Sequence, residues 1–342
     1  MELVKRFLHK IKAARILRAP FSYSLILLFS LFGKAFALEH KWDGGAARLT
    51  GYGTLGRVDK NDFEDYLVRG QLSREIGNRW NIGAVYAYDQ SANAADQWAK
   101  DAFLYVESGY GRIEAGWTDS IAGKLALVLP DVGGTRLRSN AFFLPEDFIG
   151  ITNPVIRGTQ YAWRANYASL PTRPIQIGFG AAGATSHYKS SNELGLRFRD
   201  PSGRTKSSVS LGFSYIERPD GMSSGSHLAP VVADARYQGT IGLNIQSGSL
   251  IWAATGKVIV DDNPLVDQNG TQAGTGFSYE FLKWAASANY IYSDIWTGPD
   301  AHTGIFSVRY KANKFLNIWG SVGAVWQFRR DDFVAGGFGI AF

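Results

Sequence analysis

The chain has 342 residues, which is enough for one large domain or two ordinary ones. It contains no cysteine, and this excludes disulfide frameworks, thiolate metal sites and cysteine nucleophiles. The formal net charge of +6 comes entirely from residues 1–37, which hold seven Lys and Arg and one Glu, so the rest of the chain is neutral and no nucleic-acid partner is expected.

Residues 1–37 have the composition of an export signal. Six basic residues between Lys5 and Arg18 precede an apolar run, Phe21–Phe32, and Ala35-Phe36-Ala37 supplies a small–x–small cleavage site. A membrane anchor is the alternative, but the run has about a dozen residues and a spanning helix needs roughly 20. We therefore predict a signal peptide cleaved after Ala37, followed by one barrel domain over residues 38–342.

Residues after 38 form short stretches in which apolar and polar side chains alternate, as in a β-strand. Residues 161–167 are an example, with the sequence Tyr-Ala-Trp-Arg-Ala-Asn-Tyr. Aromatic residues lie at the ends of the apolar face, and the opposite face is small or charged, which fits a wall with lipid outside and water inside. A soluble β-sandwich also alternates, but it buries its apolar face and rarely places so many Tyr and Trp at strand ends.

Sixteen such strands are predicted, joined alternately by tight turns and longer loops. The predicted ranges are 46–58, 63–76, 80–89, 98–109, 112–118, 158–168, 174–184, 191–199, 205–216, 234–246, 249–260, 272–280, 282–293, 302–311, 314–327 and 332–342. An even strand count with short turns on one rim and long loops on the other is typical of a bacterial outer-membrane barrel. The predicted fold is an all-β, transmembrane, antiparallel β-barrel.

The segment 101–119, with the sequence Asp-Ala-Phe-Leu-Tyr-Val-Glu-Ser-Gly-Tyr-Gly-Arg-Ile-Glu-Ala-Gly-Trp-Thr-Asp, resembles the Gram-negative general porin family. In that family a strand, a glycine-containing turn and a short strand lead into a long third loop. The final aromatic residue, Phe342, resembles the C-terminal insertion signal of outer-membrane barrels. Residue-specific resemblance covers only about residues 98–135, and the family's acidic loop signature is not cleanly present.

The resemblance implies a homotrimer in the outer membrane, in contact with lipid and lipopolysaccharide. It also implies that the 119–157 loop folds into the lumen and narrows it, with acidic loop residues facing basic wall residues. The candidates for this pore constriction are Asp131, Glu146 and Asp147 on the loop and Arg69 and Arg164 on the wall. Alternation also turns Arg197, Lys257 and Arg309 inward, as ordinary lumen charges or as constriction residues. A loop that caps the barrel from outside is the alternative, but its many apolar residues favour burial.

The predicted function is passive diffusion of small hydrophilic solutes and ions across the bacterial outer membrane. The second hypothesis is a substrate-specific channel for a sugar or an organic anion, which needs aromatic or strongly basic residues inside the lumen. Tyr52 and Trp319 are the best inward-facing aromatic candidates. Histidine is scarce and no Ser–His–acid arrangement is evident, so the sequence predicts no enzyme activity, no catalytic or metal site and no cofactor.

Overall fold

A computed structural model describes most of the chain after residue 37. The described residues are 38–58, 61–91, 99–130, 132, 162–183, 190–200, 205–217, 235–261, 269–295, 300–313, 316–326 and 330–341. Within them the chain forms one antiparallel sheet of 17 strands, with two short helices. The predicted signal peptide lies outside the described residues, and its cleavage remains a prediction.

The sheet contains strands of five to sixteen residues. They are β1 (Leu38–Trp42), β2 (Gly45–Val58), β3 (Asn61–Ile76), β4 (Trp80–Ser91), β5 (Ala99–Ser108), β6 (Gly111–Thr118), β7 (Ala162–Ala168), β8 (Ile175–Ala182), β9 (Ser190–Asp200), β10 (Thr205–Glu217), β11 (Ala235–Ser247), β12 (Leu250–Asp261), β13 (Gly270–Phe281), β14 (Trp284–Ile295), β15 (Ala301–Lys311), β16 (Leu316–Trp326) and β17 (Arg330–Ala341). The helices are η1 (Gly77–Arg79) and α3 (Ile121–Leu125).

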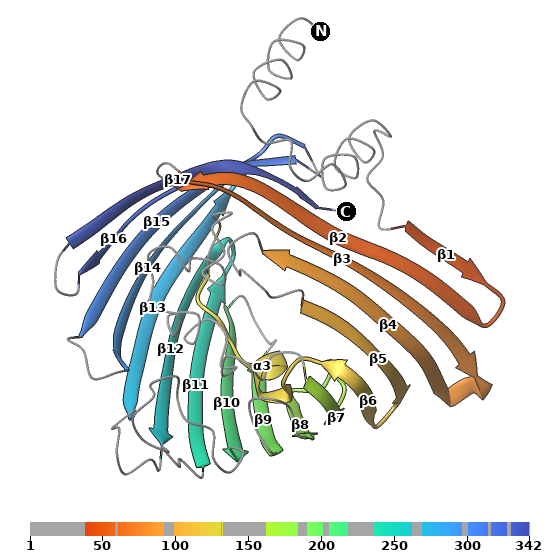
Figure 1. The fold of residues 1–342 in the computed structure, drawn as a ribbon. Helices are drawn as coiled ribbons and strands as arrows, with labels where there is room; N and C mark the ends of the chain where they lie inside the picture. The colour runs from red at the N-terminus through yellow and green to blue at the C-terminus, as the bar shows by residue number, and fades with distance from the viewer. Residues whose placement is uncertain are drawn as a thin grey trace, which may run out of the picture.

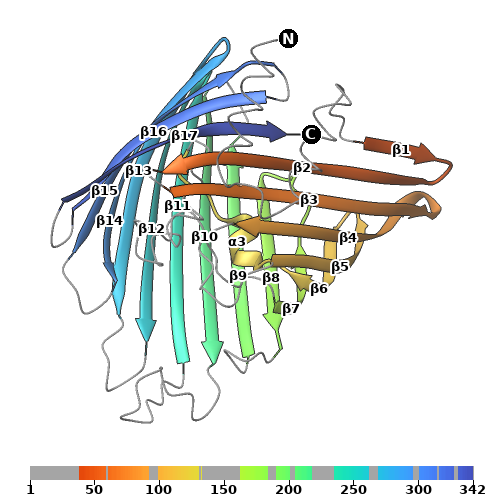
Figure 2. The ribbon, with the colours of Figure 1, turned by 45° about the horizontal axis from the view of Figure 1, so that its top comes forward.

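Strands β2–β17 close into a ring, which Figures 1 and 2 show from two directions. Each pairs with its neighbours along the chain, and β17 closes the ring by pairing with β2 from Ala335↔Val58 to Ala341↔Tyr52. The sixteen predicted strands are therefore confirmed. The prediction missed β1, which pairs with β2 from Leu38↔Leu49 to Trp42↔Gly45. Because β1 and β17 use the same edge of β2, they lie end to end beside it.

Tight turns join the strands on one rim, called here the short-turn rim. The turns include η1 and the residue pairs 109–110, 248–249 and 282–283. Gly248 has a φ of 58°, a left-handed conformation that glycine adopts at little cost. Leu282 has a φ of 53° in the β13–β14 turn, where a β-carbon makes this conformation unfavourable. Because this turn lacks the usual glycine, the predicted strands 272–280 and 282–293 are separated by residue 281 alone.

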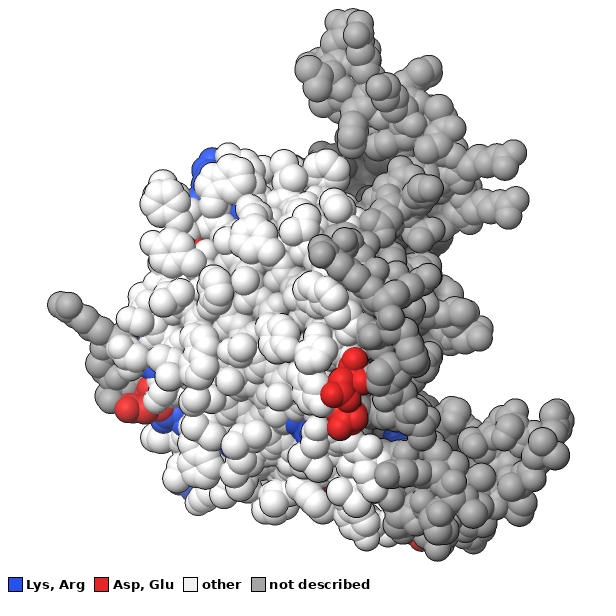
Figure 3. Space-filling model, turned by 90° about the vertical axis from the view of Figure 1, so that its left-hand side faces the viewer, with Lys and Arg blue, Asp and Glu red and all other residues white. Residues whose placement is uncertain are grey.

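The two faces of the wall differ as the alternation predicted. Large apolar side chains point outward, and Leu104 and Trp163 are 66% and 57% exposed. Small and polar side chains point inward, and Thr118 and Ser287 have no exposed surface. Figure 3 shows one outer face, where charged residues gather near the two ends and leave an uncharged band between them. Leaving so large an apolar surface in water would be costly, whereas a hydrocarbon environment suits it.

No described helix has the length and hydrophobicity needed to cross a bilayer.

Candidate functional site

The segment after β6 turns into the barrel and forms α3 there, as Figures 1 and 2 show. Ser120 caps this helix, because its Oγ accepts a hydrogen bond from the Gly123 backbone N–H at 3.3 Å. Ile121 and Leu125 are buried against the inner faces of β8 and β9. Glycine in these strands leaves room for the helix, because a β-carbon built at Gly195 would lie only 2.9 Å from Leu125 Cδ1.

The chain continues past α3 without regular secondary structure, along the inner faces of β10–β14. The Leu127 N–H donates to Ser210 Oγ at 3.0 Å, and the Val132 N–H donates to Ser287 Oγ at 3.1 Å. Asn289 Nδ2 donates to the Pro130 carbonyl oxygen at 3.0 Å. These bonds satisfy backbone groups that would otherwise be buried without a partner. The described part of the long loop, residues 119–130 and Val132, therefore lies inside the barrel, as predicted.

A buried ion pair lies beneath the start of α3. Arg164 of β7 is bonded through Nη1 to Glu193 of β9, and Ser120 donates to the same carboxylate. Arg164 has no exposed surface and Glu193 is 7% exposed. Arg164 faces inward, as alternation predicted. However, a guanidinium with no exposed surface cannot order water in an open channel, and its position favours a role in holding the loop.

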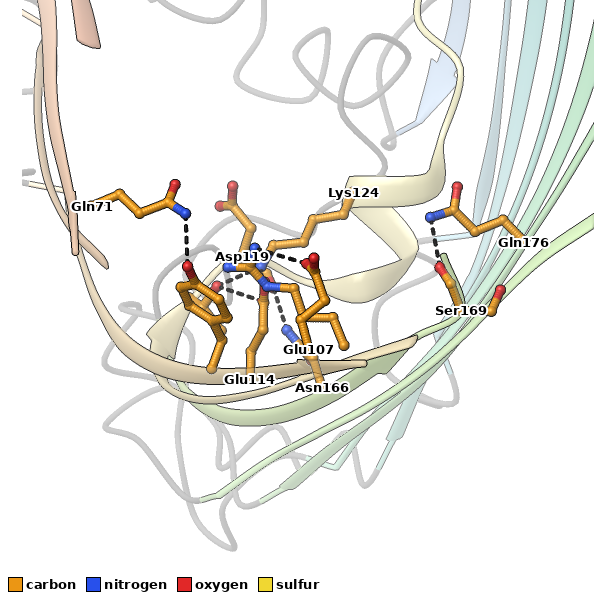
Figure 4. A network of polar contacts seen from close by, with 11 residues as sticks. Gln71, Glu107, Glu114, Asp119, Lys124, Asn166, Ser169 and Gln176 are labelled. Carbon is orange, nitrogen blue, oxygen red and sulfur yellow. Dashed lines mark hydrogen bonds and ion pairs between the residues drawn. The ribbon is translucent and has the colours of Figure 1, made fainter. Parts of the chain in front are cut away.

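A second group of charges, the lumenal charge cluster, lies where β3, β5, β6 and α3 meet, and Figure 4 shows two of its members, Glu114 and Lys124. It consists of Arg69, Arg112, Glu114 and Lys124 around the rings of Phe103 and Tyr105, with Asp101 beside them. Glu114 pairs with Arg112 Nε at 2.9 Å and with Lys124. Lys124 Nζ also donates to Thr118 Oγ1 at 2.6 Å. The helix is thus tied to the wall on this side as well.

Two aromatic rings form the floor of the lumenal charge cluster. The Arg112 guanidinium lies 3.7 Å from the centroid of the Tyr105 ring. Lys124 Nζ lies 5.0 Å and the Arg69 guanidinium 5.9 Å from the centroid of the Phe103 ring. Cations at such distances are attracted to the ring faces. Tyr105 accepts a hydrogen bond from Gln71 at 2.8 Å, which fixes its orientation. The result is a mixed group of basic and acidic side chains on the inner wall, since Asp101 also interacts electrostatically with Arg69 and Lys124.

Of the predicted constriction residues, Arg69 lies in the lumenal charge cluster and Arg164 lies under the loop. Asp131, Glu146 and Asp147 fall outside the described residues, and their role remains a prediction. Three other basic candidates also face inward: Arg197 is half-buried, Lys257 is buried, and Arg309 pairs with Glu280 at 2.9 Å. Trp319 is buried on the inner face, and the side chain of Tyr52 is not described.

Sequence reasoning missed four residues of this site. These are Arg112, Glu114, Lys124 and Glu193. Alternation in β6 could have found two of them, because an outward Trp117 turns both Arg112 and Glu114 inward. Glu193 belongs to a strand distant in sequence, and only the register of β7, β8 and β9 brings it to Arg164.

No family model matches the sequence, and a search of curated proteins finds no match. The fold, by contrast, is similar to that of solved porins. A porin refined at 1.8 Å has a TM-score of 0.62 and 16% identity, and the match covers 86% of this chain and all of that one. The anion-selective porin from Comamonas acidovorans has a TM-score of 0.63 and 11% identity, over 87% of this chain and all of that one. OmpF of Salmonella typhi, in a complex with daunomycin, has a TM-score of 0.62 and 13% identity, and the match covers 89% of this chain and all of that one. This chain therefore has the porin fold.

Proposed function

We propose that the protein is a passive diffusion channel for small hydrophilic solutes and ions in a bacterial outer membrane. The observation that carries the proposal is the closed ring β2–β17, apolar outside and polar inside, with a loop segment bonded to its inner wall. A closed barrel pairs all its strand edges, which a hydrocarbon environment requires. A loop segment inside the barrel narrows the passage and leaves the ring of strands intact. The proposal is of a channel and not of an enzyme, because the charges at the site hold a loop in place.

The proposal includes export and assembly. Residues 1–37 would direct the chain through the inner membrane and be removed, and the barrel would insert with lipopolysaccharide around its outer face. The resemblance to general porins supports a homotrimer. Electrophoresis of unheated samples should show a heat-sensitive species near three times the monomer mass. A monomer under all detergent and lipid conditions would contradict the trimer and leave the channel proposal intact.

A substrate-specific channel for an organic anion is the second candidate. The lumenal charge cluster bears on it, because three bases converge there on Phe103 and Tyr105. Glu107 and Glu114 pair with two of these bases, and Asp101 and Asp119 add two further acids to the cluster. Rings of like charge in a pore favour ions of the opposite sign. A preference for anions would therefore depend on where these bases stand along the passage and not on a net positive charge of the cluster.

Planar bilayer recordings test the function. The purified protein is reconstituted, and single-channel conductance is measured against salt concentration, with reversal potentials in a salt gradient. A conductance that rises in proportion to salt supports general diffusion. A small conductance that saturates with one organic anion supports the specific channel. Folded protein that inserts and conducts no ions would overturn both.

A further inference from the structure

A pocket of about 290 Å³ lies between α3 and the β7–β8 turn, on the inner face of β6–β9. Leu125 of the helix forms one side, and Leu170 and Pro171 of the turn form another. Its charged lining residues are Glu107, Arg112, Glu114, Lys124, Arg197 and Arg199. The pocket therefore faces the short-turn rim, on the far side of α3 from the long loops.

Two of the four bases in this pocket are already neutralised. Arg112 pairs with Glu114 and lies 3.8 Å from Glu107, and Lys124 pairs with Glu114. In this part of the lining the positive charges of Arg112 and Lys124 are therefore matched by the negative charges of Glu107 and Glu114. Arg197 and Arg199 add two positive charges that these acids do not neutralise.

The partners of these two arginines are neutral or absent among the described residues. Arg199 donates to the Pro171 carbonyl at 2.6 Å and to Gln176 Oε1 at 3.3 Å, and neither acceptor carries charge. Within the described part of the chain, Arg197 has no hydrogen-bond or ion-pair partner, and its Nε is buried without an acceptor. A buried N–H without an acceptor is costly, so such a group in a pocket marks a place for a bound acceptor.

The spacing of the two arginines suits one ligand between them. They are two residues apart on the same face of β9, so their α-carbons are roughly 6.5–7 Å apart. Gln176, directly opposite Arg197 in the β8–β9 register, supplies a further polar group at the pocket wall. Guanidinium groups bind tetrahedral oxyanions through paired N–H bonds, which makes phosphate a good chemical match.

We propose that this pocket binds a phosphate group, free or carried as an ester by a small solute, on its way through the channel. The proposal rests on the proposed channel function and names a class of solute for it. Arg197 is the principal ligand, and Arg199, already held by Pro171 and Gln176, adds the second charge. The pocket lies beside the passage, so bound phosphate slows the transit of other anions.

Calorimetric titration of the folded, detergent-solubilised protein with inorganic phosphate tests the proposal. The titration is run at low ionic strength, to limit screening, and at about pH 8, where the phosphate group carries about two negative charges. Arg197→Gln should weaken phosphate binding at least about tenfold, because a hydrogen bond to a charged group is lost. Arg197→Lys should retain part of the affinity. Glycerol phosphate, titrated in parallel, shows whether the pocket prefers the free ion or the ester.

Arg48→Gln is the matched control, because Arg48 is an exposed arginine of β2 directly opposite lumen-facing Gln71. It removes one positive charge outside the pocket and should leave phosphate affinity unchanged. Equal weakening by Arg48→Gln and Arg197→Gln would mean that only overall lumen charge matters, and would overturn the proposal. So would a wild-type protein that binds neither compound. Because this titration needs no ion conduction, it stays decisive if bilayer recordings refute the channel itself.

Discussion

The inner wall holds the long loop in two different ways. Along β6–β9, charged side chains do so: Glu114 pairs with Lys124 of the helix, and Glu193 joins Arg164 to Ser120. Along β10–β14 the contacts are uncharged, and Ser210, Ser287 and Asn289 bond to the loop backbone. The first region binds mainly side chains of the loop, with one bond from Asn166 Nδ2 to the Asp119 carbonyl oxygen at 3.0 Å, whereas the second binds peptide groups of the loop.

The conformation of the loop explains the difference. Inside α3 the backbone groups bond to one another, as in the 2.9 Å bond from the Lys124 N–H to the Ser120 carbonyl oxygen. The wall therefore contacts the helix mainly through side chains. Beyond Ala126 the backbone has no helical partners, and short hydroxyl and amide side chains of the wall supply them. A buried ion pair contributes little net stability when intact but costs much when broken, whereas each neutral bond contributes about 1 kcal/mol. The two regions should therefore respond differently to mutation.

The largest effect is expected from breaking the buried ion pair. Glu193→Ala removes the carboxylate that pairs with buried Arg164, which should lower the free energy of unfolding by about 3–5 kcal/mol. Release of the loop would let water reach Arg164, so this variant should also show raised single-channel conductance. Urea unfolding in detergent and bilayer recordings measure the two effects.

The double variant Arg164→Met with Glu193→Leu is the control for that prediction. It replaces both charged side chains by apolar side chains of similar volume. The free energy of unfolding should therefore fall much less than in Glu193→Ala alone. If the single and double variants were equally destabilised, the loss would come from packing and the ion pair would have no special role.

A smaller effect is expected from filling the space under α3. Gly195→Val places a β-carbon 2.9 Å from Leu125 Cδ1 and 3.2 Å from the Ile121 carbonyl oxygen. Overpacking of this kind costs about 1–3 kcal/mol, and displacement of the helix would widen the passage. Conductance should rise and protease should cleave the loop faster. Gly239→Val serves for comparison, since a β-carbon at Gly239 has nothing within 4 Å; a matching rise there would show that the effect is not local.

A still smaller effect is expected in the neutral region. Ser287→Ala removes the acceptor of the Val132 N–H and should lower the free energy of unfolding by about 1 kcal/mol. Ser214→Ala is the matched change, because Ser214 is also buried on the inner wall and has no hydrogen bond to the described part of the loop. Chemical denaturation compares the two. A loss for Ser287→Ala as large as for Glu193→Ala would remove the distinction between the regions.

The smallest effect is expected on ion selectivity. Arg69→Gln removes one base beside Phe103 while leaving the paired charges of Arg112, Glu114 and Lys124 in place. Anion preference should fall, seen as a shift of a few millivolts in the reversal potential in a potassium chloride gradient. The shift should shrink at high salt because of screening. An unchanged reversal potential at low salt would remove Arg69 from the constriction.

The barrel could be predicted from the sequence because its main signal is local. Strands alternate with a period of two, and sixteen of them could be counted along the chain. β1 was missed because Leu38–Trp42 is only five residues long and mostly polar or charged, and pairing with β2 defines it. The predicted boundary between β13 and β14 was misplaced because the turn between them, Leu282 and Lys283, contains neither glycine nor proline.

The site was harder to predict because its contacts are not local. Alternation turned Arg164 inward correctly, but whether it faces water or a carboxylate depends on a partner 29 residues away. The same pattern cannot tell Arg69, beside an aromatic ring, from Arg197, in a pocket. Charges on an inner wall acquire their roles only when the path of the loop is known.

A disulfide between α3 and the wall tests most directly whether the loop segment lies inside the lumen. A β-carbon built at Gly212 lies 3.6 Å from Ala122 Cβ, within the range for a disulfide, and the chain has no other cysteine. Ala122→Cys with Gly212→Cys, combined with Thr240→Ala to make room, should form this bond in the folded barrel. Single-channel conductance should then be the same before and after reduction, because the bond only fixes a contact already present. Failure to form the bond in a folded barrel, or a conductance that rises sharply on reduction, would contradict the placement of the loop.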